Sequence, residues 1–358
     1  MSTSALGRYA FINAKLRSRI GSMLDDRQVE QMLQSQSLEE LLNLCKGTPY
    51  EPLLDLYDQS ADIQRLEAWL FSRSVGLHRE VASFMSGTHA DVVTAMTRKL
   101  EVENLKGMIR LWFSNTVKRQ NIDYRYGYLF QKEIVSEIDW ERIVNAPRYE
   151  DIVTALARTP YGEAAARFEG ASLAQSGLFP LETALDRVWV SLLWSVVGNL
   201  PADDRKLVKQ VLDRDADLKN IINLVRFGYL YDLSSDTLRT LMLEGGTVSS
   251  TKEFDSYLAC PKEDRSPQAL VARRFPDLAK QLQEAGAMTT ERQTLLVERY
   301  LFAVRRKSFR AILRGYPFSF GVILAYFYLE DRQDALIRTM INGINYGYRA
   351  PEIREFAL

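Results

Sequence analysis

The chain is 358 residues long, with 46% apolar and 26% charged residues, the composition of a folded protein with room for a substantial core. Its 46 acidic and 46 basic side chains balance, which disfavours a general nucleic-acid binder because such proteins carry a basic excess. The two cysteines, Cys45 and Cys260, lack the spacing of a disulfide framework or a metal site and favour a reducing compartment.

The start of the chain and its apolar stretches predict a soluble protein. No signal-peptide pattern opens the sequence, and an arginine-rich amphipathic stretch follows the first five residues. The longest apolar stretches, residues 188–200 and 318–329, are shorter than the roughly 20 residues that span a bilayer. We therefore expect a protein that does not enter the membrane but can attach to a partner there.

Helical periodicity dominates the chain, and it predicts a nearly all-α fold. Apolar stripes at helical spacing run through residues 63–85 and 181–197, and a shorter one begins at residue 296. Strand-like alternation and hairpin turns are scarce. The stripes comprise Ile63, Leu66, Leu70, Ser74, Leu77, Val81 and Met85, then Leu181, Leu185, Val188, Trp189, Leu192, Leu193, Val196 and Val197, then Leu296, Tyr300, Ala303 and Val304.

The sequence repeats itself at a period of about 110 residues, which indicates duplicated architecture. Thr48-Pro49-Tyr50 returns as Thr159-Pro160-Tyr161, each after a similar amphipathic segment. A third copy is eroded, with Cys260-Pro261 in place of the breaker. We predict three homologous helical lobes around a pseudo-threefold axis, at residues 1–118, 119–243 and 244–358.

A second echo pairs an acid, an asparagine and an arginine at identical spacing: Glu101, Asn104 and Arg110 in the first copy, and Asp217, Asn220 and Arg226 in the second. On a helix the acid and the asparagine share a face. These six residues are predicted to fasten each repeat internally; the alternative is that they present equivalent contacts to a partner. By apolar spacing, the third copy has Leu336 and Asn342 where the others have asparagine and arginine.

A cationic ridge is predicted on one helix, because Arg306, Arg310 and Arg314 recur at i, i+4 and i+8. Clustered charge can steer an acidic partner without an overall charge excess. The ridge is therefore a candidate partner-binding surface, and an ordinary solvated face is the alternative.

Signatures of catalysis are missing. The sequence has no GxGxxG, HExxH or EF-hand pattern, and the segment 246–252 lacks the second glycine that a phosphate loop needs before its lysine. His78 and His89 are the only imidazoles, and we expect both at the surface or at helix ends. We predict no catalytic residue, cofactor or metal; a helical enzyme using an unmarked carboxylate pair is a remote alternative.

Several segments resemble the C subunit of the V/A-type rotary ATPases, the counterpart of the eukaryotic V-ATPase d subunit. They are the opening stretch 9–24, the segment 101–110, and the closing stretch 317–326 with Arg338, Gly343 and residues 351–354. The likeness covers essentially the whole chain. One departure lies at Leu336-Ile337-Arg338, where the family tends to have Asn-Leu-Arg.

The resemblance implies a funnel-shaped, three-lobed, non-catalytic rotor adaptor. It would lie at the cytoplasmic face of the membrane, peripherally, on the proteolipid rotor ring, and would receive the D and F subunits of the central stalk. One copy per complex would pass torque between ion transport and ATP synthesis or hydrolysis. A soluble helical scaffold of an unrelated complex is the alternative function.

Overall fold

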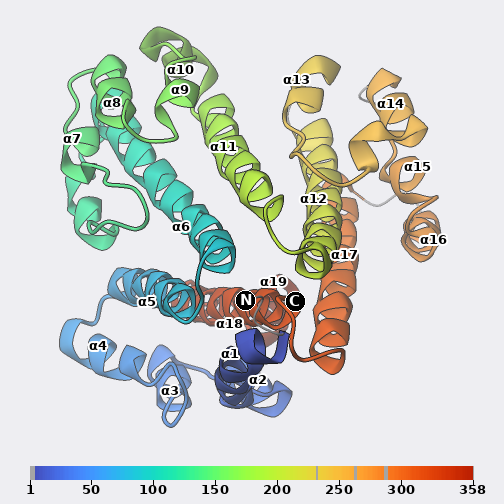
Figure 1. Ribbon diagram of the computed structural model, residues 1–358. Coiled ribbons are helices and arrows are strands. Elements are labelled where there is room, and N and C mark those ends of the chain that lie inside the picture. Colours follow the sequence, from blue (N-terminus) through green and yellow to red (C-terminus); the bar gives the residue numbers. More distant parts are fainter. Residues whose placement is uncertain (1–4, 231–232, 262–263, 286–288, 358) are drawn as a thin grey trace. The chain divides into compact units, whose positions relative to one another are not determined.

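The computed structural model describes residues 5–230, 233–261, 264–285 and 289–357, and Figure 1 shows helices joined by loops. Every regular element within these ranges is helical, so the all-α prediction is confirmed. The chain divides into two compact units, Met1–Leu200 with Pro317–Leu358, and Pro201–Tyr316. Because these units describe packing rather than repetition, the repeats 1–118, 119–243 and 244–358 stay a prediction.

The first unit combines the N-terminal helices with the last two helices of the chain. The helices are α1 (Ala5–Gly21), α2 (Asp26–Leu33), α3 (Leu38–Asn43), α4 (Pro52–Ser60), α5 (Ile63–Ser83), α18 (Gly321–Asn345) and α19 (Ala350–Ala357). Helix α18 packs on α1, α3 and α5, and α19 packs on α2 (Figure 1). Leu41, Leu70 and Ile337 lie in the core that these helices share.

Local sequence sets the starts of several of these helices. Asp25 caps α2 in a reciprocal capping box with Gln28, and Ser37 caps α3. Asp62 caps α5 by accepting the N–H of Gln64. Each cap satisfies a backbone donor that has no partner inside the helix.

A second core of the first unit forms between helices α6 and α11. Its elements are α6 (Thr88–Trp112), the π-helical turn η1 (Phe113–Val117), the 3-10 turn η2 (Asp123–Tyr128), α7 (Trp140–Val144), α8 (Tyr149–Leu156), α9 (Gly162–Ala165), α10 (Gly170–Ser176) and α11 (Phe179–Val197). The indole of Trp112 donates to the carbonyl of Ala146 at 2.8 Å, and that of Trp189 to Ala95 at 2.9 Å. These bonds let large aromatic side chains pack without an unsatisfied N–H.

The second unit is built on the long pair α12 (Ala202–Leu230) and α17 (Thr290–Arg314), which pack together. Between them in sequence come α13 (Ser235–Thr240), η3 (Val248–Ser250), α14 (Lys252–Ala259), α15 (Pro267–Val271) and α16 (Pro276–Glu284). Arg305 of α17 pairs with Asp215 of α12 through two contacts of 2.6 Å. This planar, two-point pair fixes the register of the two helices.

The predicted apolar stripes agree with the buried faces of the helices to different degrees. Helix α11 buries Leu181, Leu185, Leu193 and Val197, and the other predicted members of its stripe are half-buried. The stripe in α17 was wrong at its end: Ala303 is exposed, while Val297, Leu301 and Phe309 are buried. The buried face of α17 is shifted from the predicted one because the segment after residue 296 has too few apolar residues to show which face of the helix is buried.

Candidate functional site

Helix α6 carries a fully buried carboxylate, Glu101, which is 0% exposed. One of its oxygens accepts the backbone N–H of Val135 at 2.8 Å and also that of Ser136. The other accepts the Tyr161 hydroxyl at 2.7 Å and lies 3.2 Å from the Arg98 guanidinium. Glu101 thus joins α6 to the loop before α7 and to the turn before α9.

The repeated Thr-Pro-Tyr motif forms the same turn twice. The hydroxyls of Thr48 and Thr159 donate to the carbonyl three residues back, at 2.6 and 2.7 Å, and accept the N–H of the following tyrosine. The Tyr50 hydroxyl then donates to Asp334 of α18 at 2.8 Å, as Tyr161 donates to the buried acid of α6. In both copies of the repeated motif, the tyrosine therefore donates a hydrogen bond to a buried carboxylate on a long helix.

Asp217 of α12 is a buried acid of the second unit and is 1% exposed. One oxygen accepts the N–H groups of Thr247 and Val248 at 2.7 and 2.8 Å, and the carboxylate pairs with Arg274. Gly246 sits beside it at φ +72°, where an added Cβ would lie 2.2 Å from the carboxylate oxygen. The loop approaches the acid this closely because residue 246 has no side chain.

The two repeated asparagines make the same two-point contact with a loop. Asn104 accepts the N–H of Phe130 at 3.1 Å and donates to its carbonyl at 2.8 Å. Asn220 accepts the N–H of Leu243 at 2.8 Å and donates to its carbonyl at 3.2 Å. Each amide satisfies both backbone groups of one loop residue, as buried backbone requires.

A third such contact exists where the sequence alignment did not place it. Gln333 of α18 accepts the N–H of Leu24 at 3.3 Å and donates to its carbonyl at 2.8 Å. The acid Glu330 precedes it by three residues, the spacing of the other two copies. This contact lies three positions before the place that the alignment through Leu336 and Asn342 gives the asparagine. Asn342 itself donates to Glu67 of α5 at 2.8 Å, as the repeated arginines contact acids on neighbouring helices, so the alignment of the third copy stays a prediction.

The repeated arginines bridge neighbouring long helices. Arg110 pairs with Glu182 of α11 through two contacts of 2.6 Å, and Arg226 lies 2.5 Å from Glu298 of α17. The two arginine side chains are 58% and 52% exposed. All six predicted fastening residues therefore bond inside their own unit, and the fastening role itself stays a prediction that substitution tests.

A buried ion cluster in the first unit was missed at the level of sequence. Arg73 of α5 contacts Asp334 at 2.9 Å and Glu330 at 2.7 Å, and Ser74 donates to Asp334 at 2.8 Å. Burial raises the pKa of both carboxyls, and the Arg73 charge opposes the rise. The cluster joins α5 to α18, two helices far apart in sequence.

Both histidines are buried. The prediction of a position at the surface or at a helix end was wrong for His78, which lies inside α5, whereas His89 does lie at the start of α6. His78 stacks on Phe327, with ring centroids 3.9 Å apart, and its Nδ1 lies 2.9 Å from the Ser74 carbonyl. Burial lowers the pKa of His78 and favours the neutral ring. His89, near the start of α6, makes an edge contact with Tyr9. Both side chains act as core aromatics.

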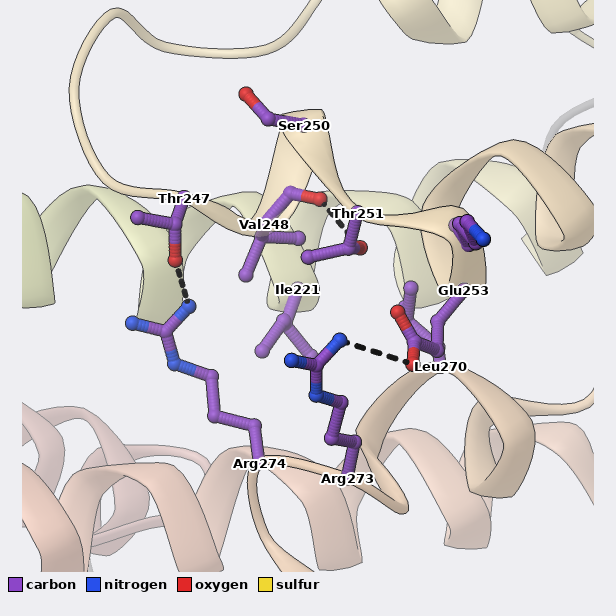
Figure 2. A pocket seen from close by; sticks show the side chains of 10 residues that line it. Ile221, Thr247, Val248, Ser250, Thr251, Glu253, Leu270, Arg273 and Arg274 are labelled. Atoms are coloured by element: carbon purple, nitrogen blue, oxygen red, sulfur yellow. Dashed lines mark hydrogen bonds and ion pairs between the residues drawn. The ribbon is translucent and has the colours of Figure 1, made fainter.

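Figure 2 shows the pocket of the second unit that lies beside the loop 246–252. Arg274 points to the Thr247 hydroxyl at 2.6 Å and also pairs with Asp217, while Arg273 faces Glu253 at 3.7 Å. Each of the two arginines therefore has a carboxylate partner, Asp217 for Arg274 and Glu253 for Arg273.

The backbone of the same loop is also engaged. A phosphate loop binds its ligand with free backbone N–H groups. Here the N–H of Gly246 donates to Asp213 at 2.8 Å, and those of Thr247 and Val248 donate to Asp217. These amides face carboxylates, an arrangement opposite to that of a phosphate cradle.

The cationic ridge lies along α17, as its spacing predicted. Arg310 and Arg314 are exposed, Arg306 is half-buried, and the three line a shallow open groove of about 650 Å³. None of the three forms an ion pair with any residue that the structure describes. Arg305, next in sequence, points instead to Asp215 and is neutralised.

Among the residues that the structure describes, we find neither a reactive cysteine nor a metal-binding cluster. Burial raises the pKa of the Cys45 thiol to about 12, which makes it a poor nucleophile. No group of three or more His, Cys, Asp or Glu residues within the described ranges could hold a metal ion.

Within the described ranges, no helix combines the length and the apolarity that a bilayer crossing demands.

Comparison with known proteins gives one consistent result. A family model described as ATP synthase (C/AC39) subunit matches residues 12–356. The chain is similar to the A-type ATP synthase C subunit of Methanobrevibacter smithii, at 24% identity over 89% of this chain and 79% of that protein. It is also similar to the corresponding A-type ATP synthase protein of Methanococcoides burtonii, at 22% identity over 94% and 90%, and to that of Thermococcus onnurineus, at 20% identity over 97% and 89%.

Proposed function

The chain belongs to the ATP synthase (C/AC39) subunit family, and from that premise we propose that it is the non-catalytic rotor adaptor of a rotary ATPase. It would join the proteolipid ring to the D and F subunits of the central stalk and transmit torque between them. The match over nearly the whole chain supports this proposal most directly. The predicted funnel of three lobes, the single copy per complex and the peripheral position at the cytoplasmic face belong to the same proposal.

The bracing of the long helices supports a mechanical role. In the first unit, Lys106 pairs with Asp186 at 2.7 Å, one turn from the pair between Arg110 and Glu182, so α6 and α11 are tied at successive levels. In the second unit, Arg226–Glu298 and Arg305–Asp215 tie α12 to α17. Ion pairs at several levels along an antiparallel pair resist sliding of one helix past the other, which a torque-bearing element requires.

The loop 246–252 supports the non-catalytic part of the proposal, because its backbone N–H groups already donate to carboxylates. We expect the isolated chain neither to bind nor to hydrolyse ATP. Isothermal titration calorimetry checks this expectation, and saturable micromolar binding of ATP would contradict it.

The adaptor role is tested by purification of the tagged chain from detergent-solubilised native membranes. We expect the stalk and proteolipid subunits to co-purify in fixed proportion. Membranes lacking the chain should hydrolyse ATP without pumping ions, and adding it back should restore pumping. Co-purification of soluble proteins alone would refute the proposal.

A further inference from the structure

Two surfaces of the second unit meet along α17. One is the cationic ridge. The other, which we call the α12–α17 groove, is a mainly apolar hollow of about 180 Å³. Gln210 and Ser308 contribute to its lining, and its apolar lining residues are Leu207, Val211, Leu218, Phe309, Ala311 and Ile312. Ala311 lines both surfaces, so the groove and the ridge are continuous.

Charge borders the groove from both helices. Arg214 of α12 lines it and is exposed. On α17, the exposed Arg310 of the ridge directly precedes Ala311, which lines the groove. Neither arginine pairs with an acid in the described part of the chain. The acid that does line the groove, Asp215, is neutralised by Arg305. The apolar hollow therefore has a net positive border.

The size of the groove argues against a small-molecule ligand. Pockets for cofactors and metabolites measure about 300–1,000 Å³, whereas this groove measures about 180 Å³. The ridge groove beside it is larger, about 650 Å³, but it is shallow and open, so it would leave a small molecule largely in solvent. A recessed hollow of that size suits individual side chains of a partner. Because its apolar residues lie between two helices rather than protruding from them, it also fits a convex helix better than a lipid surface.

We propose that the α12–α17 groove and the cationic ridge together dock an acidic amphipathic helix of another protein in the same complex. Its apolar stripe enters the groove, and acidic side chains at i, i+4 and i+8 face Arg306, Arg310 and Arg314. Phe302, 43% exposed and one turn before Arg306, extends the contact. The proposal rests on the proposed function only in taking the helix from that complex.

The test uses the isolated chain, so its outcome is independent of whether the chain co-purifies with an ATPase. The probe is a labelled helical peptide of about 20 residues, roughly 30 Å long, with leucines on one stripe and glutamates at i, i+4 and i+8 beside it. An isomer of the same composition with scrambled order is the control. We expect the patterned peptide to bind at least about tenfold more tightly by fluorescence anisotropy, and its binding to weaken as salt rises.

Charge reversal locates the contact. Arg310→Glu with Arg314→Glu should weaken binding of the patterned peptide about tenfold or more, and a peptide with lysines in place of the glutamates should bind this variant better than wild type. The matched control, Lys252→Glu with Arg273→Glu, changes the net charge equally in the other pocket and should alter affinity less than about twofold. Regained binding of the lysine peptide also demonstrates that the reversed variant is folded.

Three results would overturn the proposal: equal binding of the patterned and scrambled peptides, equal losses in the two double variants, or absence of the charge-swap rescue in a variant whose circular dichroism matches wild type. Binding of phosphatidylserine vesicles that depends on Arg310 and Arg314, without peptide binding, would assign the surface to lipid and equally refute a docked helix.

Discussion

Replacing Glu101 with glutamine isolates the charge of the acid buried in α6, since the two side chains have nearly the same size. The amide oxygen can still accept the N–H groups of Val135 and Ser136, but the NH2 group then faces two donors, Tyr161 and Arg98. Hydrogen bonds to a charged group contribute about 1.5–3 kcal/mol, against about 0.5–1.5 kcal/mol between neutral groups. The substitution thus weakens the two backbone bonds and breaks the pair with arginine.

We expect Glu101→Gln to cost about 3 kcal/mol of unfolding free energy, at the lower end of the 3–5 kcal/mol typical of a broken buried ion pair. The lower end applies because Arg98 is partly exposed and keeps a 2.7 Å bond to the Ser136 hydroxyl. For a domain of 150–250 residues, each kcal/mol lowers the melting temperature by about 2–4 °C, so a drop of roughly 6–12 °C should appear.

Urea unfolding and amide hydrogen exchange measure this effect globally and locally. Protection of the Val135 and Ser136 amides should fall about 100-fold, the equivalent of roughly 3 kcal/mol. Tyr161→Phe removes one neutral donor and should cost only about 1 kcal/mol. If Glu101→Gln stayed within about 0.5 kcal/mol of wild type, or if Tyr161→Phe cost as much, the reasoning that the buried charge organises these loops would be wrong.

Three further substitutions test other contacts. Arg226→Ala should cost at most about 1 kcal/mol in calorimetry and leave assembly intact, because this arginine is 52% exposed; a loss of stalk binding would instead favour the partner-contact alternative. Gly246→Ala should destabilise the second unit in urea by more than about 1 kcal/mol, since its Cβ would lie 2.2 Å from an Asp217 oxygen at positive φ; unchanged stability would contradict the close approach. Burial raises the pKa of Glu330, so the native state keeps the carboxyl proton to a higher pH than the unfolded chain does. The free energy of unfolding therefore falls as pH rises above 4.5, the ordinary pKa of this carboxyl. Glu330→Gln should therefore gain stability relative to wild type as pH rises from 4.5, and a difference that is constant with pH would refute this sign.

The sequence predicted features that depend on residues close together in the chain, and it missed contacts between residues far apart in the chain. The stripe of α11 was readable because a long run of apolar residues fixes one face of a helix. The Thr-Pro-Tyr echo was visible as a repeat, but its meaning was not, since the carboxylates that Tyr50 and Tyr161 reach lie 284 and 60 residues away.

The candidate site shows the same limit. The spacing of Arg306, Arg310 and Arg314 was enough to predict a ridge on one helix face. It could not tell that Arg305, in the same basic run, is neutralised by an acid 90 residues earlier. Nor could apolar spacing detect the contact of Gln333 with Leu24, although an acid three residues before an amide, as in Glu330 and Gln333, was a signal that would have pointed to it.

The contribution of α18 to the N-terminal core constrains how the chain matures during synthesis. The second unit, residues 201–316, is contiguous, so all of its residues have been synthesised before α18 begins. The core around Leu41 and Leu70, in contrast, is incomplete until Ile337 and its neighbours have been added. At about 5–20 residues per second, that wait lasts on the order of tens of seconds, with unpaired Arg73 and open apolar surface on the nascent segment. A chain interrupted before α18 would keep that surface exposed, so chaperones and proteases can distinguish incomplete copies from finished ones before any reach the assembly.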